Sequence, residues 1–233
     1  GCDDGAIHVL FAETLEPATR PPPPPAAGAV TALAYAPDDA TLAVGGADGL
    51  LELRTVSEGY ADGRPLAGHS SAVLHVDWSA DGAALQSASA SCELCFWKAP
   101  SLLPSPPPPL PSDRARADAA LSLRARQAVS AERVLDVTTM RDVRWHTRTC
   151  PLGISVAGVY PKMSDGTDVN SAHASPRADL VATSDDFRKV NIFRHPCGPA
   201  AAAPRAAAGH AAHVPLVRFT ADGAHLVSVG GPD

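Results

Sequence analysis

Short runs of alternating apolar and polar residues recur along the chain, and residues such as Asp-Gly, Pro-Asp and Gly-Gly separate them. The pattern is clear over residues 29–54 and again over residues 72–97. Because successive side chains of a strand point to opposite faces, a period of two predicts strands that are joined by tight turns. The pattern therefore predicts an all-β chain.

The runs also repeat at fixed intervals. Residues 29–54 align with residues 72–97 at an offset of 43, which brings Tyr35 onto Trp78. The segment that begins at Gly68-His69 returns 141 positions later at Gly209-His210. A divergent copy runs from Val143 to Phe193, and the first ten residues match the back half of a unit.

A repeat of about 43 residues with several strands is the WD-repeat spacing and predicts β-propeller blades. We expect a partial β-propeller of four-stranded blades, in which two half blades flank three complete blades. The expected ranges are a half blade at 1–20 (back two strands), blades at 26–66, 67–138 and 139–199, and a half blade at 208–233 (front strands). The two halves could pair into a four-bladed ring, but we favour a segment of a longer polypeptide, since propellers close with about four to eight blades.

Positions that recur from unit to unit define the structural repeat: Tyr35, Asp48, His69, Trp78, Asp81, Trp97, Trp145, Asp186, His210, Phe219 and Asp222. Val73, Val76, Trp78 and Leu85 are expected in the core. Regular WD repeats bury a hydrogen-bond network of His, Ser or Thr, Asp and Trp. Ser91 stands in the His69 unit where the preceding unit has Asp48, so we expect this network to be incomplete.

The divergent unit carries the most specific motifs: Trp145 with Thr149-Cys150, Gly158 to Pro161, Ser164 to Asn170, Asp185 to Phe187, and Phe193 to Cys197. In this order they resemble a blade of the echinoderm microtubule-associated protein-like family, which usually has a second Trp where this chain has Arg148. The resemblance covers most of the chain outside its proline-rich inserts. It implies part of the second of two tandem atypical propellers, in a cytoplasmic, cytoskeletal protein that binds tubulin or microtubules and has no enzymatic activity. A second hypothesis stays open: a WD-repeat scaffold in cilia or signalling that binds other proteins and not tubulin.

Composition narrows the class of protein. The 233 residues carry a net charge of −6, which argues against broad nucleic-acid binding. The chain has no apolar run long enough to predict a membrane span, and its N-terminus shows no secretory signal. Five scattered cysteines do not suggest a disulfide framework and favour a reducing cytoplasm.

Two proline-rich inserts interrupt the pattern, at Pro21–Pro25 and at about residues 99–130. The longer one could be a ligand for an SH3-like or profilin-like partner, but we favour a tolerated, solvent-exposed insertion. Its arginines could contact the acidic tails of tubulin, although a solvated basic loop is the simpler interpretation: Arg114, Arg116, Arg124 and Arg126.

No motif predicts a catalytic, cofactor or metal site. Cys92 and Cys95 have the spacing of half a zinc site, but the second pair is missing. The run Gly153–Gly158 is one residue too long for a nucleophile elbow. Asp165 and Asp168 lack the spacing and the terminal glutamate of a calcium loop. We therefore expect a protein that is not an enzyme.

Overall fold

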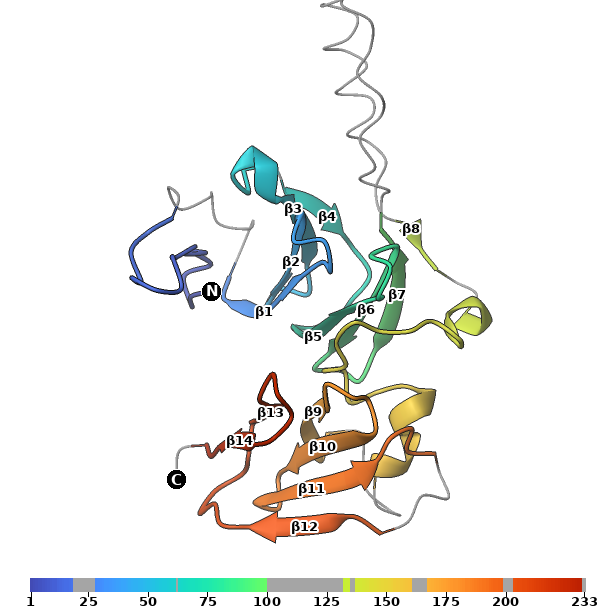
Figure 1. Ribbon diagram of the computed structural model, residues 1–233. Coiled ribbons are helices and arrows are strands. Elements are labelled where there is room, and N and C mark those ends of the chain that lie inside the picture. The colour runs from blue at the N-terminus through green and yellow to red at the C-terminus, as the bar shows by residue number, and fades with distance from the viewer. Residues whose placement is uncertain are drawn as a thin grey trace, which may run out of the picture.

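The computed structural model describes residues 1–18, 28–61, 63–99, 132–134, 137–160, 167–198 and 203–231. Antiparallel strands and three short 3₁₀ helices make up its regular structure in these ranges (Figure 1). The predicted all-β class and the four-stranded blades of a partial propeller are confirmed.

Within the described residues the strands form three four-stranded sheets and one hairpin, and each sheet is paired in chain order. Blade A consists of β1 (Val30–Tyr35), β2 (Thr41–Gly46), β3 (Leu51–Thr55) and β4 (Gly63–Leu66). Blade B consists of β5 (Val73–Trp78), β6 (Ala84–Ser89), β7 (Leu94–Lys98) and β8 (Glu132–Arg133). Blade C consists of β9 (Val169–Ala174), β10 (Leu180–Asp185), β11 (Lys189–Arg194) and β12 (Arg205–Ala208). The C-terminal hairpin consists of β13 (Leu216–Phe219) and β14 (Leu226–Val229).

The 43-residue offset is visible in the backbone. A register shift between Val30 and Ala32 in blade A recurs between Val73 and His75 in blade B. The turn between the first two strands has a left-handed residue at Asp39 in blade A, and the equivalent place in blade B is Gly82, at φ 70°. Glycine adopts this conformation without strain, whereas a residue with a side chain does so at a cost.

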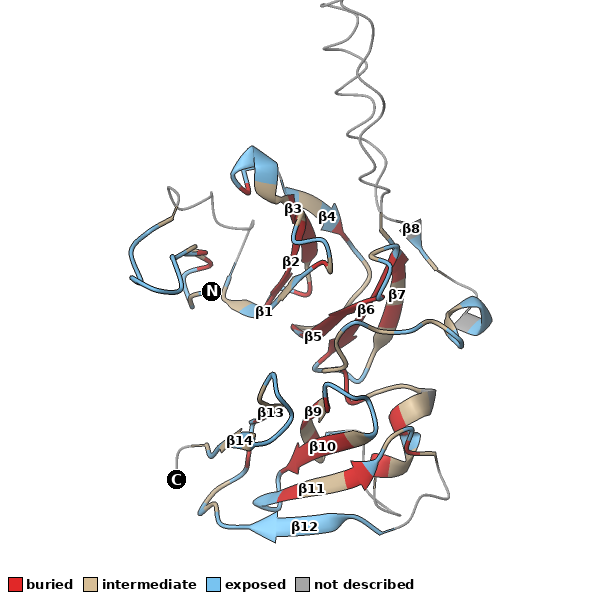
Figure 2. Ribbon diagram, viewed as in Figure 1, coloured by how far each residue is buried: buried red, intermediate tan, exposed pale blue. Residues whose placement is uncertain are grey.

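Neighbouring sheets bury their apolar faces against each other, which gives the core. Val73, Val76, Trp78 and Leu85 are buried, as the repeat predicts, in one cluster shared by blades A and B. Figure 2 shows buried residues along most of β2, β3, β5, β6 and β10, whereas the outer strand β12 is exposed along its length. A single sheet could not bury both of its faces, so the stacking of blades is what stabilises the fold.

A segment without strands lies between blades B and C, and we call residues 143–160 the wedge. It contains η3 (Ile154–Val159), and η2 (Val137–Met140) precedes it. Ser79, just after β5, forms a β-bridge with Trp145, while Val156 and Val159 pack into the core of blade C. The wedge thus joins two blades that do not stack in the way that blades A and B do.

Two of the expected units have features that the pattern did not anticipate. In place of the two strands expected at 1–20, residues 1–18 form a single β-bridge between Leu10 and Pro17, and Ile7 packs against blade A. The outer strand β12 lies beyond residue 199, where the pattern placed the end of its unit. The insert at Pro21–Pro25 lies outside the described residues, and so does the insert at 99–130 except for Ala99. In the described ranges, no helix is long and apolar enough to cross a membrane.

Candidate functional site

The histidine network of the blade B unit is present, which corrects the expectation that it is incomplete. His69 Nε2 lies 2.6 Å from Ser87 Oγ, and Trp97 Nε1 donates to the same Ser87 oxygen at 2.8 Å. Glu93 supplies the carboxylate, with Oε2 at 3.4 Å from His69 Nδ1. The expectation failed because it placed the acid at residue 91. The side chain of Glu93 is longer than that of an aspartate and reaches the His69 ring from two residues further along.

Glu93 is held in place by the residues around His69. It accepts hydrogen bonds from the Ser70 amide and hydroxyl and from the Ser89 hydroxyl. These bonds lower the pKa of Glu93 to about 2, chiefly through the Ser70 amide. Burial lowers the pKa of His69, so this ring is a neutral structural group at pH 7. The C-terminal hairpin repeats the His–Ser pair of this network, in which His210 Nε2 lies 2.8 Å from Ser228 Oγ.

The repeat aspartates lie in turns and cap them. Asp81 accepts the Ser79 hydroxyl at 2.5 Å and the Ala83 amide at 3.0 Å. Asp222 accepts the equivalent bonds from Thr220 and Ala224. Asp48 accepts the Leu50 amide, and Asp186 accepts the side-chain amide of Asn170. Asp48, Asp81 and Asp222 fix the geometry of their own turns in this way, whereas Asp186 links its turn to β9.

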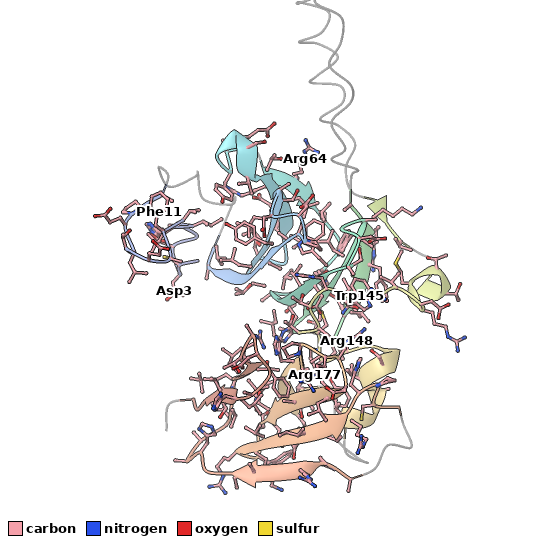
Figure 3. The ribbon with its side chains drawn as sticks, viewed as in Figure 1. Asp3, Phe11, Arg64, Trp145, Arg148 and Arg177 are labelled. Atoms are coloured by element: carbon pink, nitrogen blue, oxygen red, sulfur yellow. The ribbon has the colours of Figure 1, made fainter. Side chains whose placement is uncertain are left out.

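The aromatic repeat residues Tyr35, Trp78 and Phe219 end the strands β1, β5 and β13. Trp78 is only 2% exposed and donates from Nε1 to the Ala34 carbonyl of blade A at 3.0 Å. Tyr35 is 42% exposed, and its hydroxyl lies 3.0 Å from that of Tyr60. Trp145 lies elsewhere, in the wedge, where its ring is 6.0 Å from that of Phe96 (Figure 3). The equivalent end of β9 is Ala174.

Asp77 of β5 is the residue that fastens the wedge to blade B, and the repeat pattern gave it no role. Its carboxylate is fully buried and accepts hydrogen bonds from the Thr147 hydroxyl at 2.9 Å, the Thr149 amide at 2.7 Å and the Cys150 amide at 3.0 Å. Gln86 donates a fourth at 3.0 Å. Burial alone would raise the pKa of Asp77, but these bonds outweigh it and lower the pKa. A charged residue between Val76 and Trp78 in a core strand was the signal in the sequence.

Arg148, a charged residue of the wedge, also lies between blades B and C (Figure 3). Its guanidinium donates to the Ser155 hydroxyl, and its carbonyl accepts the Ala174 amide of blade C at 3.1 Å. Burial lowers its pKa, and the charge of Asp77 opposes that shift. Arg148 is therefore accommodated near a buried carboxylate of opposite charge.

The two cysteines with zinc-like spacing have different surroundings. Cys92 is exposed, at φ 58° in the β6–β7 turn, whereas Cys95 is buried with its sulfur 3.8 Å from His69 Nδ1. All five cysteines are free. Among the residues that the structure describes, no group of three or more His, Cys, Asp and Glu could hold a metal ion.

Blade C carries several exposed cations, and other exposed cations lie around blade B and the wedge: Lys98, Arg133, Arg141 and Arg144. Arg177 in the β9–β10 turn, Arg194 at the end of β11 and Arg205 at the start of β12 lie at one end of this sheet, which we call the basic end of blade C. Arg188 and Lys189 lie at the opposite end. Asp179 lies close to Arg177 and Arg194, and these charges help to keep its pKa low, after the hydrogen bond from Ser175.

Comparison with known proteins gives consistent matches over most of the chain. The family model for the echinoderm microtubule-associated protein second beta-propeller matches residues 116–233, and the WD domain, G-beta repeat, matches residues 24–53 and 63–98. The chain is 38% identical over 203 residues to human echinoderm microtubule-associated protein-like 3, which covers 85% of the chain and 19% of that protein. It is 36% identical over 202 residues to the 77 kDa echinoderm microtubule-associated protein of Strongylocentrotus purpuratus, covering 85% of the chain and 25% of that protein.

A third relative is echinoderm microtubule-associated protein-like 1 of Rattus norvegicus, at 33% identity over 207 residues, 88% of the chain and 22% of the relative. The chain thus spans a quarter or less of the length of these relatives. The resemblance found in residues 145–197 is confirmed by a family model that covers half of the chain. The chain belongs to the echinoderm microtubule-associated protein-like family, and its residues 116–233 match the model of that family's second beta-propeller.

Proposed function

We propose that the chain is a non-catalytic interaction module that binds tubulin or microtubules, in the cytoplasm and on the cytoskeleton. The observation that carries the proposal is its membership of a family whose members are named as microtubule-associated proteins, at 33–38% identity over most of the chain. Fold alone would not support it, because propellers serve many functions.

The roles of the polar residues support a binding protein. Asp77 holds the wedge, Glu93 and Ser87 hold His69, and the repeat aspartates cap turns. Each of these groups has hydrogen-bond partners that fix it in a structural role. Catalytic acids and bases instead need a free position toward a substrate.

Charge supports the basic end of blade C as the contact with tubulin. Arg177, Arg194 and Arg205 are exposed, whereas the chain as a whole carries a net charge of −6. A local cationic patch attracts an acidic partner, while the remaining acidic surface repels it. The protein therefore meets such a partner with the patch facing it. The acidic tails of tubulin are a partner of this kind.

Co-sedimentation of the full chain with microtubules, together with pull-down of unpolymerised tubulin, tests the proposal. The triple variant Arg177→Glu, Arg194→Glu, Arg205→Glu should lower the bound fraction several-fold, and added salt should weaken binding of the unmodified chain. The double variant Arg188→Glu, Lys189→Glu is the control. It changes the charge by the same amount per residue at the opposite end of blade C, and it should bind microtubules normally. If the unmodified chain binds neither form of tubulin at micromolar concentration, the proposal fails and the scaffold hypothesis gains.

A further inference from the structure

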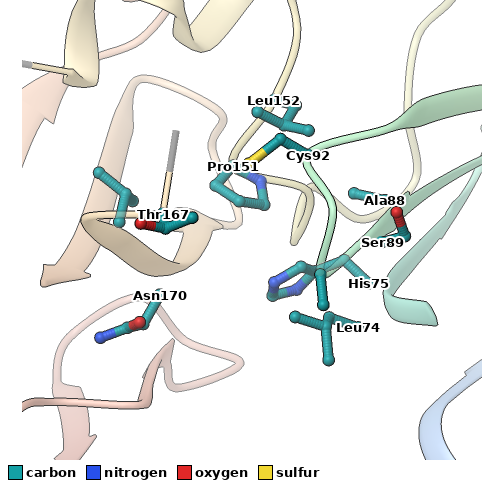
Figure 4. Close-up of a pocket in the computed structure, with 11 residues that line it drawn as sticks. Leu74, His75, Ala88, Ser89, Cys92, Pro151, Leu152, Thr167 and Asn170 are labelled. Carbon is teal, nitrogen blue, oxygen red and sulfur yellow. The ribbon is translucent and has the colours of Figure 1, made fainter. Parts of the chain in front are cut away.

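A cavity of about 200 Å³ opens between blade B, the wedge and the start of blade C (Figure 4). Leu74 and Leu152 are among its apolar walls. His75 Nδ1 is buried, so a ligand in this cavity does not reach it. Backbone groups that a partner can reach lie instead at the outer edge of blade C.

The outer edge of β12 carries free backbone groups. β12 pairs with β11 through four residues, from Arg205 opposite Ile192 to Ala208 opposite Lys189. In an antiparallel ladder alternate residues direct their N–H and C=O groups to the partner strand, so two residues of β12 direct theirs outward. All four residues are exposed, and within the described residues no backbone hydrogen bond outside the ladder involves them. The edge is therefore a template for one more strand.

The outer strands of the other two blades offer less to a partner. Pro65 lies in β4 and has no N–H to donate, and β8 spans only two residues. Proline and short length are common ways in which edge strands avoid pairing with other chains. β12 has four residues and no proline, and three of them are alanines, whose methyl groups leave room for the side chains of an added strand.

Arg205 gives this edge a positive charge on one face of the sheet. It is paired with Ile192, and Arg194 lies two positions further along β11, so both arginines are on the same face. Both are exposed, and within the described residues neither takes part in an ion pair. No acidic residue belongs to β11 or β12. An added strand places alternate side chains beside Arg205 on this face, where an acid would meet its charge.

We propose that an acidic segment of tubulin binds along the outer edge of β12 as a fifth strand of blade C, with a carboxylate beside Arg205. Its backbone pairs with the free N–H and C=O groups, and its acidic side chains select it by charge. An extended segment of about four residues, roughly 13 Å long, spans the edge. The inference deepens the proposed function, on which it rests for tubulin as the source of the segment.

A second copy of this chain fits the same edge poorly. Antiparallel pairing of two β12 strands over their four residues brings Arg205 of each copy opposite Ala208 of the other, next to Lys189. Like charges of the two copies then lie close together at both ends of the pair, which destabilises it. An acidic segment meets the same charges with attraction.

Amide hydrogen exchange in β12 tests the mode of binding. In the ¹⁵N-labelled full chain, two alternate amides among residues 205–208 should exchange fast, because they have no partner. The probe is the peptide N-acetyl-Glu-Thr-Glu-Val-Glu-Thr-amide, whose glutamates share one face when it is extended. At millimolar concentration it should slow the exchange of these two amides by about tenfold.

Two controls separate strand addition from simple attraction between charges. The same peptide methylated on its backbone nitrogens keeps its charge but cannot donate hydrogen bonds, and it should leave the two amides unprotected. Arg205→Glu should weaken the peptide several-fold, whereas Arg141→Glu, at an exposed site just after η2, should not. Equal protection by both peptides, or no protection by either, would overturn strand addition.

Microtubules supply the second arm of the experiment. Exchange measured by mass spectrometry should slow in the segment that contains β12 when intact microtubules are added, and not when their acidic tails have been removed by limited proteolysis. If the chain co-sediments with microtubules while β12 stays unprotected, strand addition is wrong and the proposed function stands. If the peptide protects β12 but neither form of tubulin binds, the proposed function fails and tubulin is not the source of the segment. Slow exchange of all four amides in a chain that sediments as a dimer would overturn the proposal in favour of a second copy.

Discussion

Asp77 and Thr149 are 72 positions apart in the sequence, yet the Thr149 amide donates to the Asp77 carboxylate at 2.7 Å. This bond and its neighbours to Thr147 and Cys150 attach the wedge to an inner strand of blade B. A buried carboxylate is stable only where several donors satisfy it, and here it has four. The wedge and blade B are therefore expected to unfold as one unit.

Replacing Asp77 should destabilise the protein strongly. Asp77→Ala leaves two backbone amides, a hydroxyl and a side-chain amide without their acceptor, at a cost of about 3–5 kcal/mol in the free energy of unfolding. Asp77→Asn keeps one acceptor oxygen and should cost less. Urea denaturation measures the change. Asp81→Ala, at an exposed turn, serves as the control, and an equal loss there would show that Asp77 has no special role.

Ser87 connects the two rings of the histidine network. Ser87→Ala removes the partner of both Trp97 Nε1 and His69 Nε2, so we expect a loss of about 2–3 kcal/mol by thermal or urea unfolding. Ser228→Ala removes the hydroxyl that faces His210 in the C-terminal hairpin and should cost less. If Ser87→Ala lowered the free energy of unfolding no more than Ser228→Ala does, the network would not contribute to the stability of blade B in this way.

Trp78 fills the contact between blades A and B. Trp78→Ala deletes a buried aromatic ring and its bond to Ala34, and should destabilise the chain by about 3–5 kcal/mol. Tyr35→Ala removes the equivalent aromatic residue of blade A, which is much more exposed, and should cost clearly less. A melting temperature that Trp78→Ala leaves unchanged would contradict this packing.

Acid should destabilise the protein below neutral pH. Burial lowers the pKa of His75 and of His173 to about 4 from an ordinary value of 6.5, against the charge of Asp77 and together with that of Arg218. Between these values the unfolded chain binds protons that the folded chain does not. Its stability is therefore highest above pH 6.5 and falls as the pH drops toward 4. His75 contributes up to about 3 kcal/mol to this loss.

Urea unfolding at several pH values between 7 and 4.5 measures this slope. His75→Gln cannot titrate and should flatten it. A free energy of unfolding that is constant over the range would contradict the burial of the two rings.

The repeat made much of this fold predictable from sequence. The offsets that align Tyr35, Trp78 and Phe219 placed them at the ends of three strands, because a blade repeats the same inward positions. Core residues such as Val73 and Leu85 followed from the repeat and its stacked blades.

Long-range polar contacts were not predictable in the same way. The wedge residues that bond to Asp77 lie in a segment without hydrophobic periodicity, so no sequence pattern predicted these hydrogen bonds. Glu93 was missed because the repeat carries a shorter acid at a different place in the turn, and only the folded geometry shows that its side chain reaches His69. Trp145 was counted among the repeat positions because the divergent copy begins at Val143, yet it lies in the wedge.

Hydrogen exchange at the Thr149 and Cys150 amides tests most directly whether Asp77 fastens the wedge to blade B. We expect both amides in the unmodified chain to exchange as slowly as the core of β6, and Asp77→Asn to release them first. Rapid exchange of the two amides in the unmodified chain would contradict the attachment of the wedge.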